Sequence, residues 1–286
     1  MRQNYYLEDW GFCATAEQVE SLPEGSFQVH IDTELKSGHL RIGEFYLPGE
    51  TSDEILINSY LCHPHGANDN LSGVAVGIEL FKQLKKLPKR RLSYRLAIWP
   101  ETIGPITWVN KEKEKLSNLI GGFEVSICGD PSSLTYNKSM AGDGITDRAV
   151  AHVTKYSNHR VRIKKYLHTR SGCDQGVFNM PGIRLPFGRI ARAGANSSGY
   201  REYHTSADDL ALVRSEYLLD TLTFFGKFSK FWNEIRSGRQ ITQEHHLCLA
   251  MAFIRTIMVS AEVNPSQIKL LKPIMNSWLL WTAKET

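Results

Sequence analysis

Five side chains along the sequence are of the types that hold and assist a catalytic metal ion. They are His63, Asp69, Glu101, Asp130 and His204. Catalytic zinc takes histidine nitrogen and carboxylate oxygen from a protein and leaves one coordination position for water. That water becomes a nucleophile near neutral pH, and a nearby glutamate can take its proton. Two histidines and three carboxylates therefore supply the residue types for both the ligands and the base.

Spacing alone leaves an ordinary role open for each of these residues. A histidine at the end of a strand is commonly only hydrogen-bonded. Asp130 precedes a proline, a pairing that is also typical of turns. The residues after His204 include Thr205, Ser206 and Asp208, any of which can cap a helix. The flanking elements must therefore bring these side chains together before a site is credible.

The candidate residues fall where predicted strands end. Alternating apolar residues predict strands over 27–32, 39–48 and 54–61, with turn-forming residues between them. His63 follows the last of these strands. After Asp69 the apolar spacing changes to that of a largely buried helix, from Leu71 to Leu84.

Two more predicted strands, Leu92–Trp99 and Phe123–Cys128, end just before Glu101 and Asp130. Strands that alternate with helices indicate an α/β sandwich with a mixed, mostly parallel sheet. In such sheets, ligands collect outside the carboxyl ends of the strands. Farther on, the pattern predicts these elements: a strand at Val150–Lys155, a short helix at Asp174–Met180, a strand at Ile183–Ile190, an amphipathic helix at Leu210–Ile235, and a helical tail from Gln243.

The overall charge and apolar pattern argue against nucleic-acid and membrane partners. The net charge is +4, from 34 basic and 30 acidic residues, and the densest basic run, 82–91, is predicted to be a solvated helix end. The longest apolar stretch, 247–259, is too short to span a bilayer and contains Arg255. No secretory signal is visible at the start, and the five cysteines are scattered. We therefore expect a cytoplasmic protein.

The segment GANDNLSGVAV, preceded by CHP, resembles the zinc aminopeptidase family that includes bacterial leucyl aminopeptidase and glutaminyl cyclase. The motifs YYLEDWGFC, CHPHGANDNLSG, WPETIG, CGD, CDQGVFNMPGIRLPFG and EYHTSADDL are similar, in this order, to one uncharacterised branch of that clan. Its members are described as aminopeptidase-like domain proteins, some linked with polysaccharide biosynthesis. The resemblance runs from about Tyr5 to about Leu210. It implies a three-layer α/β sandwich of the zinc exopeptidase type.

The resemblance also implies roles for single residues. His63 matches the first ligand histidine and His204 the last. Asp69 matches the aspartate that bridges two metals in the di-zinc relatives, and Asp130 matches the ligand aspartate at the end of the next strand. Glu101 matches the glutamate general base. One further residue, Asp174, falls near a family aspartate that would support the ligands without binding the metal.

Two departures from the family pattern affect the metal count. Thr102 stands where the di-zinc relatives have a second ligand glutamate, and His65 replaces the aspartate that supports the first histidine. One metal position keeps three ligands, but the other keeps only Asp69 and His204. We therefore expect one zinc ion, with a second left open. If Glu101 joins the ligands, the base is unassigned. Cys62, beside His63, is small, which favours a buried structural role over metal ligation.

The predicted organisation is a zinc aminopeptidase-like hydrolase domain over 1–240, which lacks N-terminal elements of the branch, and a helical tail of unknown role over 241–286. The default substrate, by resemblance, is a peptide with a free N-terminal amine. Two alternatives stay open: an amidohydrolase acting on an N-acyl or sugar-linked amide, and a binding or structural descendant without activity. The sequence indicates neither a specificity pocket nor an oligomeric state.

Overall fold

The computed structural model describes residues 10–34, 36–166, 173–192 and 200–234. The chain divides into two units, residues 1–40 and residues 41–286. The predicted tail over 241–286 lies outside the described residues. None of the helices in the described ranges is long and apolar enough to cross a membrane.

The first unit contains one short helix, α1 (Ala16–Glu20). It begins with a capping box in which Thr15 and Gln18 exchange side-chain and backbone hydrogen bonds of 2.8 and 3.1 Å. The strand predicted over 27–32 is absent from the structure, and its alternate apolar residues, including Phe27, are exposed. That prediction was wrong because alternation forms a strand only where a neighbouring strand takes up the backbone hydrogen bonds.

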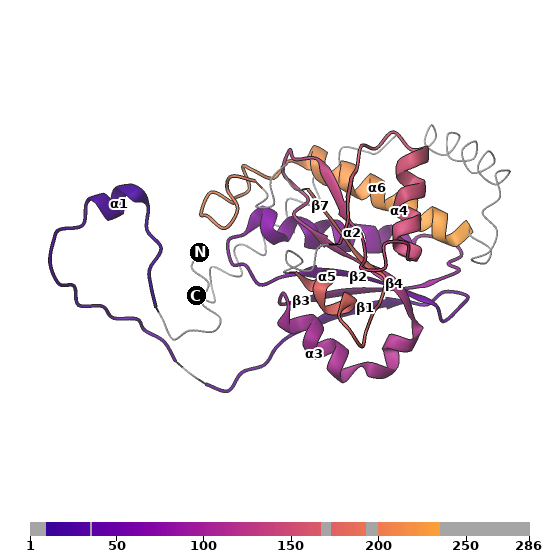
Figure 1. The fold of residues 1–286 in the computed structure, drawn as a ribbon, viewed down its shortest axis with the longest axis horizontal. Helices are drawn as coiled ribbons and strands as arrows, with labels where there is room; N and C mark the ends of the chain where they lie inside the picture. The colour runs from indigo at the N-terminus through magenta and orange to yellow at the C-terminus, as the bar shows by residue number, and fades with distance from the viewer. Residues whose placement is uncertain (1–9, 35, 167–172, 193–199, 235–286) are drawn as a thin grey trace. The chain divides into compact units, whose positions relative to one another are not determined.

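The second unit is built on one seven-stranded sheet (Figure 1). Its four inner neighbours β3, β2, β4 and β7 run parallel, whereas β1 is antiparallel to β3, and β5 is antiparallel to β7. The predicted mixed, mostly parallel sheet is therefore confirmed. In sheet order the strands are β1 (Gly43–Leu47), β3 (Ser93–Trp99), β2 (Glu54–Tyr60), β4 (Leu119–Ser126), β7 (Phe187–Arg192), β5 (Leu134–Asn137) and β6 (Arg162–Lys164).

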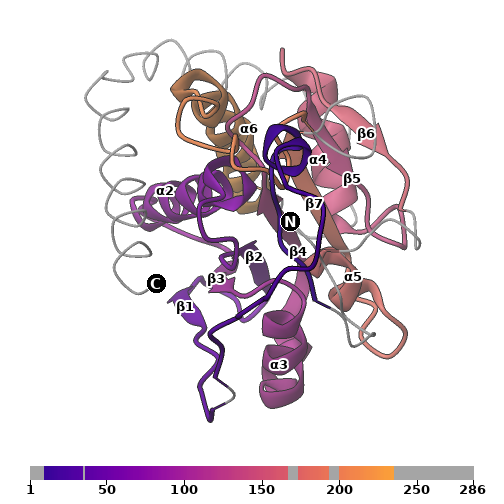
Figure 2. The ribbon, with the colours of Figure 1, turned by 90° about the vertical axis from the view of Figure 1, so that its left-hand side faces the viewer.

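Helices cover both faces of this sheet and complete three layers (Figures 1 and 2). Along β2, Ile55 and Ile57 enter one apolar cluster, and Leu56 enters the other. This alternation is what a strand buried on both faces requires. The first cluster is covered by α2 (Gly73–Lys85), α4 (Ile145–Tyr156) and α6 (Ser215–Glu234), and the second by α3 (Ile103–Lys111) and α5 (Asp174–Asn179).

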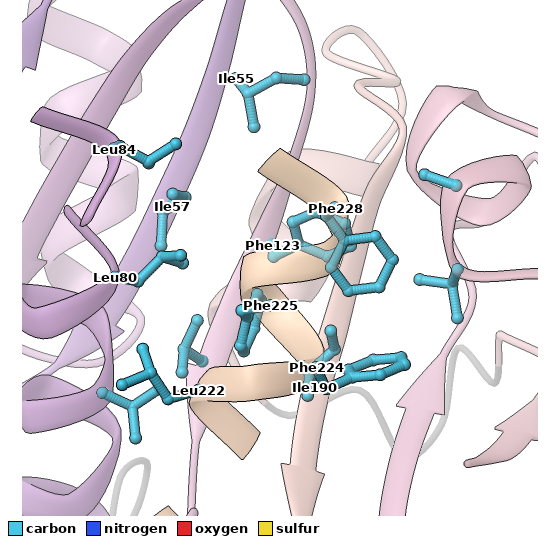
Figure 3. Close-up of a cluster of buried hydrophobic side chains, with 14 of the residues drawn as sticks. Ile55, Ile57, Leu80, Leu84, Phe123, Ile190, Leu222, Phe224, Phe225 and Phe228 are labelled. Carbon is cyan, nitrogen blue, oxygen red and sulfur yellow. The ribbon is translucent and has the colours of Figure 1, made fainter. Parts of the chain in front are cut away.

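The larger cluster is rich in aromatic rings (Figure 3). Phe123 of β4 contacts Phe225 and Phe228 of α6, with ring centroids 5.9 and 5.6 Å apart. The long amphipathic helix predicted at 210–235 is thus present as α6, and its aromatic stripe packs on the sheet. The packing fixes β4, whose carboxyl end leads into the candidate site.

Several element predictions need correction. The strand predicted at Val150–Lys155 is the second half of α4, because Ala149, Val150 and Val153 share one buried helix face. The strand predicted over 39–48 is confined to β1, and α3, β5 and β6 were not predicted. The basic run behaves as predicted: Arg90 donates to the carbonyls of Leu84, Lys85 and Leu87 at 3.2–3.4 Å, beyond the end of α2.

Candidate metal centre

Three predicted ligands meet beyond the carboxyl ends of the parallel strands. His63 follows β2, Asp69 lies in the short helical turn η1 (Ala67–Ser72), and His204 lies in the turns before α6. The Asp69 Oδ2 atom is 3.1 Å from Nε2 of His204 and 4.0 Å from Nε2 of His63. All three donor atoms lie within 4.8 Å of one another. Two nitrogens and one oxygen, with a position left open, fit a catalytic zinc ion.

Asp69 is buried and held in its charged form. Its Oδ1 atom accepts a hydrogen bond from the Tyr60 hydroxyl at 2.7 Å, which leaves Oδ2 to the two histidines. Burial raises the pKa of Asp69, but the contacts with His204, His63 and Tyr60 outweigh it and hold the pKa below its usual value. A carboxylate that stays ionised is available to a cation over the neutral range.

Asp208, four residues after His204, fastens the loop that carries Asp69. Its carboxylate accepts the backbone N–H groups of Asn68 at 2.6 Å and Asp69 at 3.0 Å. The Tyr200 hydroxyl donates to the same carboxylate. The sequence analysis gave Asp208 only as a helix cap. One side chain therefore joins the two segments that supply Asp69 and His204.

Glu101, the predicted base, sits at the start of a strained turn after β3. Thr102 has φ 64° and ψ −58°, and the Ile103 N–H donates to the Glu101 carbonyl at 2.7 Å. This combination is a classic-type γ-turn, which is rare for a β-branched residue. Burial, followed by the negative charge of Glu124, raises the pKa of Glu101 to about 7.

Asp174 holds that turn and does not join a metal group in the described residues. Its Oδ1 atom accepts the Thr102 N–H at 2.7 Å, and its Oδ2 atom accepts from Asn58 at 2.6 Å and from the Trp99 indole at 2.7 Å. Burial and the neighbouring Glu124 raise the pKa of Asp174. Three N–H donors on one carboxylate make Asp174 the support of the segment that carries Glu101.

Asp130 lies apart from the groups that the other candidates form. It is fully buried, its Oδ2 atom accepts from the Asn68 side chain at 2.9 Å, and its Oδ1 atom accepts the Ser132 N–H at 2.8 Å. Among the described residues, neither cluster of metal-ligand types includes Asp130. Its contacts instead fix Asn68, the neighbour of Asp69.

Cys62 is exposed, contrary to the buried role favoured from the sequence. Its Sγ atom lies 3.3 Å from Nδ1 of His63 and 3.3 Å from the Glu101 backbone N–H nitrogen. Partial burial of the thiol raises its pKa to about 11. The thiol is therefore protonated at neutral pH, which argues against a cysteine–histidine nucleophile pair.

Sequence reasoning also missed an ion pair beneath the site. Glu124 and Arg189 are paired residues on β4 and β7, and the Arg189 Nε atom lies 3.0 Å from Glu124 Oε1. Arg189 also donates to Ser126 at 2.9 Å. An apolar strand with one internal glutamate gave no signal of its partner, since the partner lies more than sixty residues along the chain.

The fold and this donor set define an aminopeptidase-like α/β protein. Residues 9–234 match the protein family described as "Domain of unknown function (DUF4910)". A Clostridium acetobutylicum protein, named as a candidate polysaccharide biosynthesis protein with an aminopeptidase-like domain, is 38% identical over 218 residues, which are 76% of this chain and 49% of the relative. The chain belongs to this aminopeptidase-like family, and it spans about half the length of that relative.

Solved structures agree with this assignment. A crystal structure named as a candidate peptidase from Clostridium acetobutylicum has a TM-score of 0.74 and 35% identity, covering 82% of this chain and 54% of that one. A zinc aminopeptidase from Bacillus subtilis has a TM-score of 0.56 and 17% identity, covering 66% of this chain and 48% of that one. The second likeness shows the fold, and it confirms the predicted zinc exopeptidase type.

Proposed function

We propose that this chain carries a metal-dependent, aminopeptidase-like hydrolase site that cleaves an amide bond. The observation that carries the proposal is the gathering of His63, Asp69 and His204 donor atoms within 4.8 Å of one another. These three residues would hold one zinc ion. Zinc bound there supplies Lewis-acid polarisation of an amide carbonyl and acidifies a water molecule.

In this proposal Glu101 is the general base. A pKa of about 7 suits a group that must accept a proton from water and return it to the leaving amine near neutral pH. The γ-turn at Thr102, fixed by Asp174, keeps the Glu101 carboxylate within 4.8 Å of a ligand atom of His63. The base is therefore held beside the metal position by backbone geometry.

We assign the other predicted residues to support of the site. Asp130 orients Asn68, and Asp174 orients the Glu101–Thr102 turn. With Thr102 in place of a second carboxylate, Asp69 and His204 alone are too few to hold a second zinc. We therefore propose a single zinc ion.

The substrate is proposed to be a peptide with a free N-terminal amine. A second candidate, an N-acyl or sugar-linked amide, is favoured by the name of the Clostridium acetobutylicum relative, which includes polysaccharide biosynthesis. Aminoacyl-arylamides tested beside N-acylated amino sugars distinguish the two, because only the first class presents a free α-amine.

Metal analysis of the purified chain tests the proposal. We expect about one zinc per chain, its loss in His63→Ala, and its retention in Glu101→Gln together with loss of hydrolysis. His65→Asn is the matched control, because His65 is exposed and asparagine tolerates its φ of 67°. Zinc well below one equivalent and unaffected by His63→Ala would favour a binding or structural descendant without activity.

A further inference from the structure

A second group of metal-ligand types shares one residue with the first. The ligand atoms of Cys62, His63 and Glu101 also lie within 4.8 Å of one another. The Cys62 sulfur is beside Nδ1 of His63 at 3.3 Å, whereas Asp69 is nearer the other ring nitrogen, Nε2, at 4.0 Å. The two groups therefore lie against opposite nitrogens of one imidazole.

We propose that Cys62, His63 and Glu101 form a second metal position, suited to a thiophilic dication such as Zn²⁺ or Cd²⁺. Thiolate, imidazole and carboxylate are together a zinc-type ligand set. With Zn–S near 2.3 Å and Zn–N near 2.0–2.1 Å, a tetrahedral site separates the sulfur and nitrogen by about 3.5 Å. The observed 3.3 Å is close to that value. The exposure of Cys62 gives the ion a route to the sulfur.

The two positions exclude each other at His63. A neutral imidazole has one nitrogen lone pair to offer and carries its proton on the other nitrogen. A metal on Nε2 leaves an Nδ1–H that donates to the Cys62 sulfur, which then supports the ligand from outside. A metal on Nδ1 turns the Nε2–H toward Asp69. Binding at the second position also releases the Cys62 thiol proton to solvent.

Occupation of the second position would inhibit the activity proposed above, so this part of the inference rests on the proposed function. It removes His63 from the first group and uses the carboxylate of Glu101, the proposed base. Excess zinc should therefore lower hydrolysis after the first equivalent. Cys62→Ser should abolish that inhibition, because the serine hydroxyl is a poor ligand for a thiophilic ion.

The direct test is titration of the full chain with Cd²⁺, followed by the ultraviolet charge-transfer absorbance of a cadmium–thiolate bond. We expect this band in the natural chain and in His204→Ala, which disrupts only the first group. We expect it to vanish, or to need at least tenfold more Cd²⁺, in Cys62→Ser and in Cys62→Ala. Cys13→Ser, an exposed cysteine in the first unit, is the matched control and should keep the band.

Two results would overturn the inference: no thiolate band in the natural chain, or an unchanged band in both folded Cys62 variants. Circular dichroism of each variant confirms folding, and the pair of substitutions protects against loss of one. The band requires no catalysis. A Cys62-dependent band in a chain without hydrolase activity would therefore defeat the proposed function and leave the second metal position standing.

Discussion

The backbone N–H of Asp69 donates to Oδ2 of Asp208 at 3.0 Å, so one candidate ligand is held by a residue four positions after another. Removing the Asp208 carboxylate frees two buried N–H groups, those of Asn68 and Asp69. We predict that Asp208→Ala weakens zinc binding by about 10–100-fold, the usual effect of losing a supporting contact.

Competition with a chromogenic chelator measures that affinity. Asp209→Asn is the control, because Asp209 is exposed and its carboxylate accepts only the nearby Ala211 N–H among the printed contacts of the described chain. An unchanged dissociation constant in Asp208→Ala would show that the Asp69 loop keeps its shape without this side chain.

The Asp69 loop also depends on the glycine at its start. A Cβ atom at Gly66 would lie 1.8 Å from the Asp69 carbonyl oxygen, far inside contact distance. We predict that Gly66→Ala lowers the free energy of unfolding by about 2–3 kcal/mol and displaces Asp69 from the histidines. Urea denaturation measures the first effect and zinc content the second. Gly38→Ala, with nothing within 4 Å of its Cβ, should change neither.

The turn at Thr102 stores strain that glycine would relieve. A non-glycine residue with φ 64° costs about 1–3 kcal/mol, partly offset by the extra chain entropy that glycine loses on folding. We predict that Thr102→Gly raises the free energy of unfolding by about 1 kcal/mol. Thr102→Ala is the matched control, since alanine keeps the strain. Equal stability of the two variants would mean that the turn relaxes without a glycine.

The sequence predicted the parts of the fold that local pattern controls. β2 and β3 are continuous apolar runs of strand length, and α6 repeats aromatic residues at helical spacing. Val150 and Val153 misled because a short apolar segment is compatible with both a strand and a helix, and only packing on the sheet decides.

The candidate site shows a similar division. His63, Asp69 and His204 were found through motif resemblance, and the structure brings them together. The supports were harder to predict, since Asp208 and Asp174 act on backbone N–H groups far away in sequence. Nothing local in a sequence reports such contacts, because the fold has to form before donor and acceptor meet.

The raised pKa of Glu101 makes stability depend on pH in the metal-free chain. Its pKa is about 7 when folded and near 4.5 when exposed, so the folded state binds the proton more tightly. The stabilisation is complete below about pH 4.5 and is lost as pH rises through 7. Glutamine carries no such charge. We therefore predict that metal-free Glu101→Gln matches the natural chain at pH 4.5 and exceeds its free energy of unfolding by about 2 kcal/mol at pH 8.

Urea denaturation in the presence of a chelator at the two pH values measures this difference. Glu114→Gln, at an exposed glutamate, is the control and should show no pH-dependent gain. A gain in Glu101→Gln that is the same at both pH values would mean that the Glu101 carboxyl titrates alike in the folded and unfolded chains. The buried Glu124 would then exert no effective repulsion on Glu101, and the match between its pKa and the proposed base role would be lost.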